Sequence, residues 1–321
     1  AGNDVITGGL GDDNITGGSG DDTITGGAGA DTITVDFGTD TITDFNTTDD
    51  TLSISSGATA SVTFTTLTGS GDYSKNVKST GTLFITTSIT DASIIGSNGI
   101  NSIVGSTGSD SITGGLSNDT IIAGDGNDVI KDSSGSNNLN GGLGDDSITG
   151  GIGNDTIIGG DGNDIISDTG GNNNIDGGSG DDSIVGGNNN DSITGGDGDD
   201  SIIGGSGNDT LTGGSGNDTF DSGTGVDTIT DFNLTDDTLI ISANGVANVI
   251  ATNVTSDYSN VTNKGVLSVT VAVTIKDDMV ITGTTGVNSI TGGNGNDSIT
   301  GGASNDTLSG GTGDDTLTGG D

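Results

Sequence analysis

Apolar residues recur at every ninth position along most of this chain. Between residues 8 and 34 the sequence reads as three tandem nonapeptides, GGLGDDNIT, GGSGDDTIT and GGAGADTIT. A longer run of fifteen nonapeptides extends from Gly96 to Thr230 without an insertion, and its eighth position is always apolar. The pattern resumes over 283–321, with apolar residues at Ile290, Ile299, Leu308 and Leu317. This spacing predicts a repeat architecture in which each nonapeptide forms the same structural unit.

Within a nonapeptide, positions 7 to 9 alternate polar, apolar and polar, as in Thr-Ile-Thr. This alternation predicts a very short β-strand whose middle side chain points inward. Positions 1, 2 and 4 are mostly glycine, which favours a tight turn with positive φ and close backbone approach. One buried aliphatic side chain per nine residues is a thin core beside the entropy of ordering the backbone. Another interaction must therefore hold the turns together.

Composition narrows the choice of that interaction. The 321 residues include 65 Gly but no Pro, Cys, His or Trp, and the net charge is −41. Such an acidic, aromatic-poor chain would be disordered if it were not a repeat. Nucleic acid and anionic membranes would repel it, whereas divalent cations would bind. The sequence has no apolar run of about 18 residues, so no membrane span is expected.

The sixth position supplies the candidate ligands, because it is aspartate in twenty repeats. Calcium takes six to eight oxygen ligands from carboxylates and carbonyls, which two stacked glycine turns with their aspartates could provide. Zinc would want His or Cys, and magnesium demands tighter octahedral geometry. We expect many calcium ions, on the order of one per aspartate-bearing turn. The candidates are Asp4, Asp13, Asp22, Asp31, Asp40, Asp110, Asp119, Asp128, Asp146, Asp155, Asp164, Asp182, Asp191, Asp200, Asp209, Asp218, Asp227, Asp297, Asp306 and Asp315.

These nonapeptides resemble the GGxGxDxUx repeat of RTX proteins, a calcium-binding family. The resemblance implies an all-β fold, a parallel β-roll (a β-solenoid) with two nonapeptides per coil, and export followed by folding in external calcium. On this basis we expect roll sections at 1–43, 96–230 and 283–321. Two small β inserts or linkers, 44–95 and 231–282, would interrupt the roll. The chain begins and ends within a repeat, so a longer array is expected.

Two nonapeptides per coil would place alternate repeats on opposite edges of the roll. One edge, here called the aspartate edge, carries Asp110, Asp128, Asp146, Asp164, Asp182, Asp200 and Asp218. The other, the mixed edge, has Asn101, Asn137 and Asn173 among its aspartates, so we expect weaker calcium sites beside these asparagines. Asp132 and Asp168 could compensate as ligands, a point that the sequence leaves open.

The two inserts resemble each other, since DTITDFNTTDDTL at 40–52 matches DTITDFNLTDDTL at 227–239. Alternating runs such as SVTFTTL predict strands, and the acidic stretch of each motif could also hold calcium. Each insert either seals or links roll sections or forms a lateral contact surface. Such a surface would use Phe64, Tyr73, Phe84, Tyr258, Lys75, Lys78, Lys264 and Lys276.

Three function classes remain open. The first is a calcium-dependent extracellular structural protein at a bacterial cell surface: a surface-layer, sheath or matrix-filament component, or an adhesin extender, that self-associates. The second is the secretion-aiding region of an exported hydrolase or epimerase. The third, an ice-binding solenoid, lacks a regular outward rank of Thr and Asn at position 3. Because the chain has no His, Cys or Arg and its aspartate pairs fall in repeat turns, we expect no enzyme activity.

Overall fold

The computed structural model is all-β, and the residues it describes contain no helix. Consequently, no helix in the described part is long and apolar enough to cross a membrane. The described residues are 1–46, 49–55, 57–64, 71–72, 77–79, 81–87, 91–233, 236–241, 245–251, 255–258, 261–263, 265–271 and 278–320. They divide into two compact units, Ala1–Ile166 and Ser167–Asp321.

Every pair of neighbouring strands in the first unit is parallel. Its strands are β1 (Val5–Leu10), β2 (Asn14–Thr16), β3 (Thr23–Ala28), β4 (Thr32–Val35), β5 (Gly38–Ile42), β6 (Thr51–Ile54), β7 (Ala58–Phe64), β8 (Gly71–Asp72), β9 (Val77–Ser79), β10 (Thr82–Thr87), β11 (Ser93–Ile95), β12 (Ile100–Val104), β13 (Ser111–Thr113), β14 (Thr120–Asp125), β15 (Val129–Lys131), β16 (Asn138–Leu143), β17 (Ser147–Thr149) and β18 (Thr156–Asp161). One sheet has the order β1-β3-β5-β7-β10-β12-β14-β16-β18. The opposite side of the coil is made of β2-β4-β6-β9 and of β8-β11-β13-β15-β17.

The second unit repeats this plan after β19 (Ile165–Ser167), which spans the division in the sequence. Its strands are β20 (Asn174–Ser179), β21 (Ser183–Asn188), β22 (Ser192–Asp197), β23 (Ser201–Ser206), β24 (Thr210–Ser215), β25 (Thr219–Asp221), β26 (Gly225–Ile229), β27 (Thr238–Ile241), β28 (Gly245–Ala251), β29 (Thr255–Asp257), β30 (Thr262–Asn263), β31 (Val266–Val271), β32 (Val280–Thr282), β33 (Val287–Asn294), β34 (Ser298–Gly302), β35 (Thr307–Thr312) and β36 (Thr316–Gly320). They pair as β20-β22-β24-β26-β28-β31-β33-β35, as β21-β23-β25-β27-β30 and as β29-β32-β34-β36, again all parallel.

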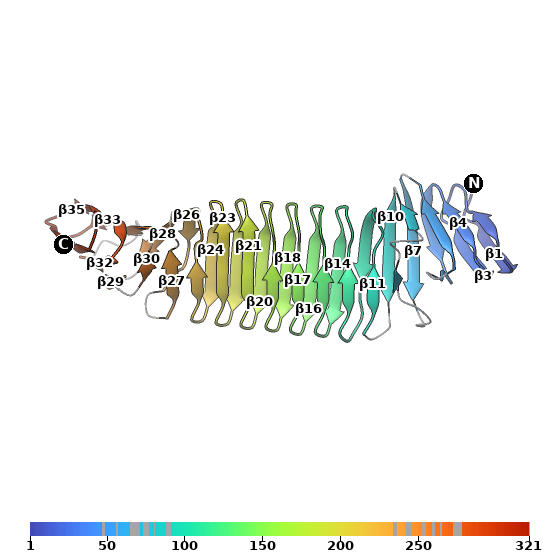
Figure 1. Cartoon of the computed structure of the whole chain (residues 1–321), viewed down its shortest axis with the longest axis horizontal. Coiled ribbons are helices and arrows are strands. Elements are labelled where there is room, and N and C mark those ends of the chain that lie inside the picture. The colour runs from blue at the N-terminus through green and yellow to red at the C-terminus, as the bar shows by residue number, and fades with distance from the viewer. Residues whose placement is uncertain are drawn as a thin grey trace. The chain divides into compact units, whose positions relative to one another are not determined.

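The predicted parallel β-roll is confirmed, with two nonapeptides per coil. Residues 18 apart face each other in neighbouring coils, as Ile121 faces Leu139 on β14 and β16. In Figure 1 the strands β14, β16 and β18 lie side by side as successive coils. Many strands are longer than the three residues that the sequence predicts. For example, β14 continues through the following Ala-Gly-Asp and pairs there with β16.

The core is a single row of apolar side chains on each side of the coil. Position 8 is buried in the long run, including Ile112 and Ile121 at 0% exposure, whereas position 7 and 9 side chains are mostly exposed or half-buried. Glycine at positions 2 and 4 has the left-handed backbone that the turn requires: φ is 118° at Gly142 and 114° at Gly144. A Cβ on Gly142 would also strike the Gly124 carbonyl oxygen of the preceding coil. Close stacking and positive φ both therefore favour glycine there.

Strands of both inserts continue the sheets of their own unit. In the first insert β7 pairs with β5 on one side and with β10 on the other, and β10 pairs with β12 of the next roll section. The second insert has the same arrangement, with β28 and β31 between β26 and β33. These coils are longer than 18 residues, since Thr59 faces Thr82. The described strands of the inserts are thus enlarged coils.

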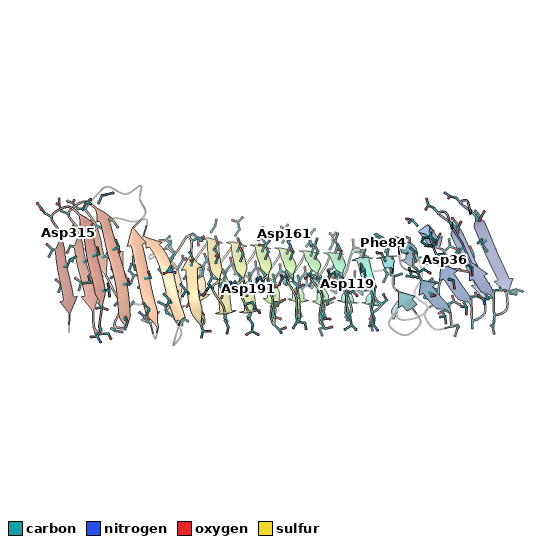
Figure 2. All side chains as sticks on the ribbon, turned by 90° about the horizontal axis from the view of Figure 1, so that it is seen from above. Asp36, Phe84, Asp119, Asp161, Asp191 and Asp315 are labelled. Atoms are coloured by element: carbon teal, nitrogen blue, oxygen red, sulfur yellow. The ribbon has the colours of Figure 1, made fainter. Side chains whose placement is uncertain are left out.

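The prediction that Tyr258 belongs to a contact surface on the inserts is wrong. Tyr258 is only 1% exposed, because its ring stacks on Phe232 at a centroid distance of 6.3 Å, and Phe232 meets Phe220 edge-on at 6.2 Å. Phe84, labelled in Figure 2, is 42% exposed, and its part in a contact surface stays a prediction. The side chains of Phe64, Tyr73, Lys75, Lys78, Lys264 and Lys276 lie outside the described residues.

Candidate calcium-binding turns

The aspartates of position 6 line the inner side of the turns. Most of the twenty candidates are buried, and Asp200, for example, is 2% exposed. The exceptions belong to the first and last repeats: Asp4 is exposed, and Asp13, Asp306 and Asp315 are half-buried. Burial of a carboxylate is costly unless hydrogen bonds or a cation compensate it.

Most of these carboxylates accept a hydrogen bond through one oxygen from the neighbouring turn of the same edge. Asp128 Oδ1 accepts a hydrogen bond from the Asp110 backbone N–H at 2.7 Å, and Asp146 Oδ1 accepts one from Asp128 N–H at 2.7 Å. The mixed edge repeats the bond, from Asp209 N–H to Asp227 Oδ1 at 2.9 Å. The carboxylates thus form a ladder in which a carboxylate reaches the turn before its own. In the first unit, Asp119 lies on the mixed edge, whereas Asp161 lies in a turn of the aspartate edge (Figure 2).

The second oxygen, Oδ2, has a different environment. Among the described residues it has no hydrogen-bond donor in Asp13, Asp22, Asp31, Asp40, Asp128, Asp146, Asp191, Asp200, Asp209, Asp227, Asp297 and Asp306. A Cβ on Gly195, the first residue of its turn, would contact Asp200 Oδ2 and lie 2.6 Å from the Gly213 carbonyl oxygen of the next turn. The same two kinds of oxygen converge above Gly141 and Gly292. Two buried acceptors that share one space need a hydrogen-bond donor or a cation between them.

This convergence also explains the glycine at position 1. Gly195 does not have a positive φ, unlike Gly196 beside it at 127°. A Cβ on Gly195 would nevertheless fill the space that the two oxygens share. The candidate site therefore favours glycine at this position, whereas the backbone of the turn favours glycine at positions 2 and 4.

Without a cation, these carboxylates resist ionisation. Burial, which removes water from the charged form, raises the pKa of Asp119, Asp191 and Asp200 from an ordinary 3.8 to about 7. It raises the pKa of Asp146 and Asp227 to about 6 for the same reason. Backbone hydrogen bonds lower the pKa and neighbouring carboxylates raise it, but burial is the largest effect. A bound divalent cation would favour the charged forms instead.

Asp132 adds a second carboxylate to one turn of the mixed edge. It replaces the usual glycine at position 1 and is buried, and a Cβ on Gly114 would contact Asp132 Oδ2 and lie 2.9 Å from Asp119 Oδ2. Asp119 N–H donates at 2.8 Å to Asn137 Oδ1, the residue that stands where an aspartate is usual. Asp132 therefore lies where its carboxylate could replace the one that Asn137 lacks. Asp168 is buried as well, and its charge raises the pKa of Asp191.

Sequence reasoning missed how the inserts continue the ladder. Asp50 Oδ1 accepts from Asp31 N–H at 2.9 Å, so Asp50 takes the place of a position 6 aspartate, but its Oδ2 accepts from Asn46 N–H at 2.8 Å. Asp237 does the same with Asp218 and Asn233. The first aspartate of the motif is also engaged, since Asp44 accepts from Gly26 and Gly27 N–H at 2.8 Å. The motif DFNxTDD, which both inserts share, was the sequence signal that could have predicted these contacts.

The donor set suits a hard cation. Among the described residues no three carboxylates converge, so a cation bound here would need backbone carbonyl oxygens beside the carboxylates. Calcium accepts such mixed oxygen ligands and irregular geometry. Which of the twenty aspartates bind an ion stays a prediction.

Comparison with known proteins agrees with this geometry. The chain matches the family described as the RTX calcium-binding nonapeptide repeat (4 copies) over residues 1–23, 7–42, 95–130, 132–166, 158–193, 167–202, 194–229 and 281–321. A search of curated proteins finds no match. RTX repeats are known calcium-binding motifs, and proteins that carry them are typically exported. Because these ranges cover more than half of the sequence, the chain belongs to the RTX calcium-binding nonapeptide repeat family.

Proposed function

We propose that this chain is an extracellular structural protein whose β-roll folds and stiffens when calcium fills its turns. The observation that carries the proposal is the row of buried Oδ2 atoms that face carbonyl oxygens without a donor. In the folded chain these acceptors and a net charge of −41 oppose compaction. Calcium bound between successive turns would supply the missing positive charge.

The aspartates of position 6 would hold each ion together with carbonyl oxygens of the turns. Asp200 illustrates this, because Oδ2 faces its own turn and Oδ1 reaches the preceding one through Asp182 N–H at 2.8 Å. Extracellular calcium modules bind at about 10⁻⁴–10⁻³ M. Such affinity would leave the chain unfolded inside a bacterial cell and fold it outside, which suits export as an unfolded chain.

Circular dichroism tests this coupling of folding to calcium. The whole chain should show little β signal in chelator and a cooperative gain in calcium raised to about 5–10 mM. Magnesium at the same ionic strength is the control, and it should produce a much smaller gain, because it retains water and demands octahedral geometry. Equal β content in chelator and in calcium would contradict the proposal.

Self-association into a filament or layer is the second part of the proposal. Uniform roll surfaces are anionic and repel one another, whereas protein interfaces favour aromatic residues. Phe84, 42% exposed on an insert coil, supports a contact there. In calcium, the parent should form larger species by light scattering and electron microscopy, and Phe84→Ser should reduce them. Leu143→Ser, at an aliphatic residue of the roll that is 48% exposed, is the matched control. A parent that stays monomeric at every calcium concentration would refute the assembly.

A further inference from the structure

The asparagine that opens the long roll section makes contacts unlike those of the aspartates. Asn101 is 1% exposed. Its amide Nδ2 donates to the carbonyl oxygens of Ser97 at 2.9 Å and Gly99 at 2.7 Å in its own turn. It also donates to Gly114 O at 3.3 Å and Asp119 Oδ1 at 3.1 Å in the next turn. One nitrogen therefore lies among four oxygens from two successive turns.

Asn288 makes the same four contacts at the start of the last roll section. Its Nδ2 donates to Gly286 O at 2.6 Å and Thr284 O at 3.2 Å in its own turn. The contacts to the next turn are Gly301 O at 3.1 Å and Asp306 Oδ1 at 2.9 Å. Asn288 is 1% exposed and was not identified from the sequence, although it stands at position 6. Two separate turns therefore share one arrangement.

The remaining polar atom of each amide is satisfied as well. Asn101 Oδ1 accepts from Ser97 N–H at 2.9 Å and from Ser97 Oγ–H at 3.0 Å. Asn288 Oδ1 accepts from Thr284 N–H at 3.0 Å and from its hydroxyl at 2.9 Å. Ser97 and Thr284 replace the second glycine of the repeat. The two turns thus pair donors with the acceptors that an aspartate turn leaves facing one another.

We propose that Asn101 and Asn288 are built-in substitutes for a calcium ion, so that the first turn after each insert closes without metal. The proposal rests on calcium binding by the aspartate turns. An amide donor supplies partial positive charge to carbonyl and carboxylate oxygens, as the cation does, and its two N–H groups are shared among the four oxygens. It adds no net charge and needs no dissolved ligand.

The position of these turns agrees with that role. In the preceding coil, Leu83 faces Asn101 and Leu267 faces Asn288, and both leucines are fully buried. The ladder of carboxylates on this edge is therefore interrupted by apolar residues inside each insert. A metal-free turn lets the ladder restart beside an apolar coil, and the first candidate calcium site then lies one turn later.

Asn137 shows that an asparagine at position 6 is not sufficient. Its Nδ2 lies 3.5 Å from Gly150 O, a long bond, and the same turn carries Asp132. The tight set of four contacts is thus present in the Asn101 and Asn288 turns and absent from the Asn137 turn. We infer that asparagine turns are of two kinds and that the Asn101 and Asn288 turns are metal-free.

Calcium stoichiometry of the whole chain tests the proposal. Asn101→Asp and Asn288→Asp should each add one bound ion, and the double variant two, by equilibrium dialysis with metal analysis at saturating calcium. Asn98→Asp makes the same charge change at an exposed position of the same turn and should add none. Unchanged stoichiometry in both aspartate variants, with folding confirmed by circular dichroism, would overturn the inference. A parent that binds no calcium would instead refute the proposed function.

Hydrogen exchange gives a second readout that does not depend on counting ions. In a calcium titration, residues 96–104 of the parent should gain protection from exchange at a lower calcium concentration than those of Asn101→Asp. The reason is that the variant turn becomes ordered only when it binds its own ion. Asn101→Ala removes the donor and should reduce protection of this turn at every calcium concentration. If Asn101→Asp and the parent gain protection together, the amide does not replace the ion.

Discussion

Truncation of one aspartate within the aspartate edge should remove two calcium ions. Asp200 Oδ1 accepts from Asp182 N–H at 2.8 Å, which places this oxygen at the preceding turn, while the buried Oδ2 faces its own turn beside Gly195. In the metal-free turn, Asn101 Nδ2 contacts Asp119 Oδ1 of the next turn, which shows that Oδ1 reaches the space between turns. Asp200 therefore belongs to two neighbouring sites, and Asp200→Ala should damage both.

The cost follows from linkage between binding and folding. An ion at about 100 times its dissociation constant stabilises the folded state by about 2.7 kcal/mol. Loss of two such ions in calcium of about 10 mM, with affinities near 10⁻⁴ M, costs about 5 kcal/mol. The unpaired Asp182 N–H adds about 1–3 kcal/mol. Because the effect is local in a repeat protein, the turns around residue 200 should open first.

Metal analysis and hydrogen exchange at fixed calcium measure both parts of this prediction. Asp200→Ala should bind two ions fewer than the parent and lose protection in the turns that contain Asp182 and Asp200. Asp197→Ala is the matched control, since Asp197 is exposed in the same turn and carries the same charge. A loss of one ion would show that each carboxylate serves a single site, and no loss would refute the assignment.

Three further changes test the same geometry. In chelator, the β signal should rise as the pH falls from about 7 to 4, because the raised pKa of about 7 at Asp119, Asp191 and Asp200 stabilises the folded chain only when these groups are protonated. This stabilisation is complete below their ordinary pKa of 3.8 and is lost as the pH rises through 7, so a flat circular dichroism profile would contradict it. Gly195→Ala should abolish one calcium site and lower the melting temperature in calcium, because its Cβ would enter the space beside Asp200 Oδ2; unchanged binding by metal analysis would rule this out. Asp132→Gly restores the usual glycine and should weaken one mixed-edge site about tenfold or more, as a shift in calcium titration; equal affinity would mean that Asp132 is no ligand.

The period of nine and the alternation at positions 7 to 9 predicted short strands between glycine turns, and the resemblance to RTX repeats predicted that they form a roll. Both depend on local geometry, since side chains alternate across a strand and glycine alone tolerates the turn. The inward position of residues such as Ile121 and the burial of Asp200 follow from their place in the repeat. Because every repeat obeys the same rule, one sequence frame predicts the environment of nearly all of them.

Only the tertiary structure shows how the chain folds where the nonapeptide repeat is interrupted. The inserts have no fixed period, so the sequence could not show that β7 and β10 continue the sheet or that Tyr258 is buried against Phe232. Nor could it separate Asn101 from Asn137, which occupy the same position of the repeat. Their difference depends on which oxygens of two turns 18 residues apart face one nitrogen, and this is fixed by the stacking of coils.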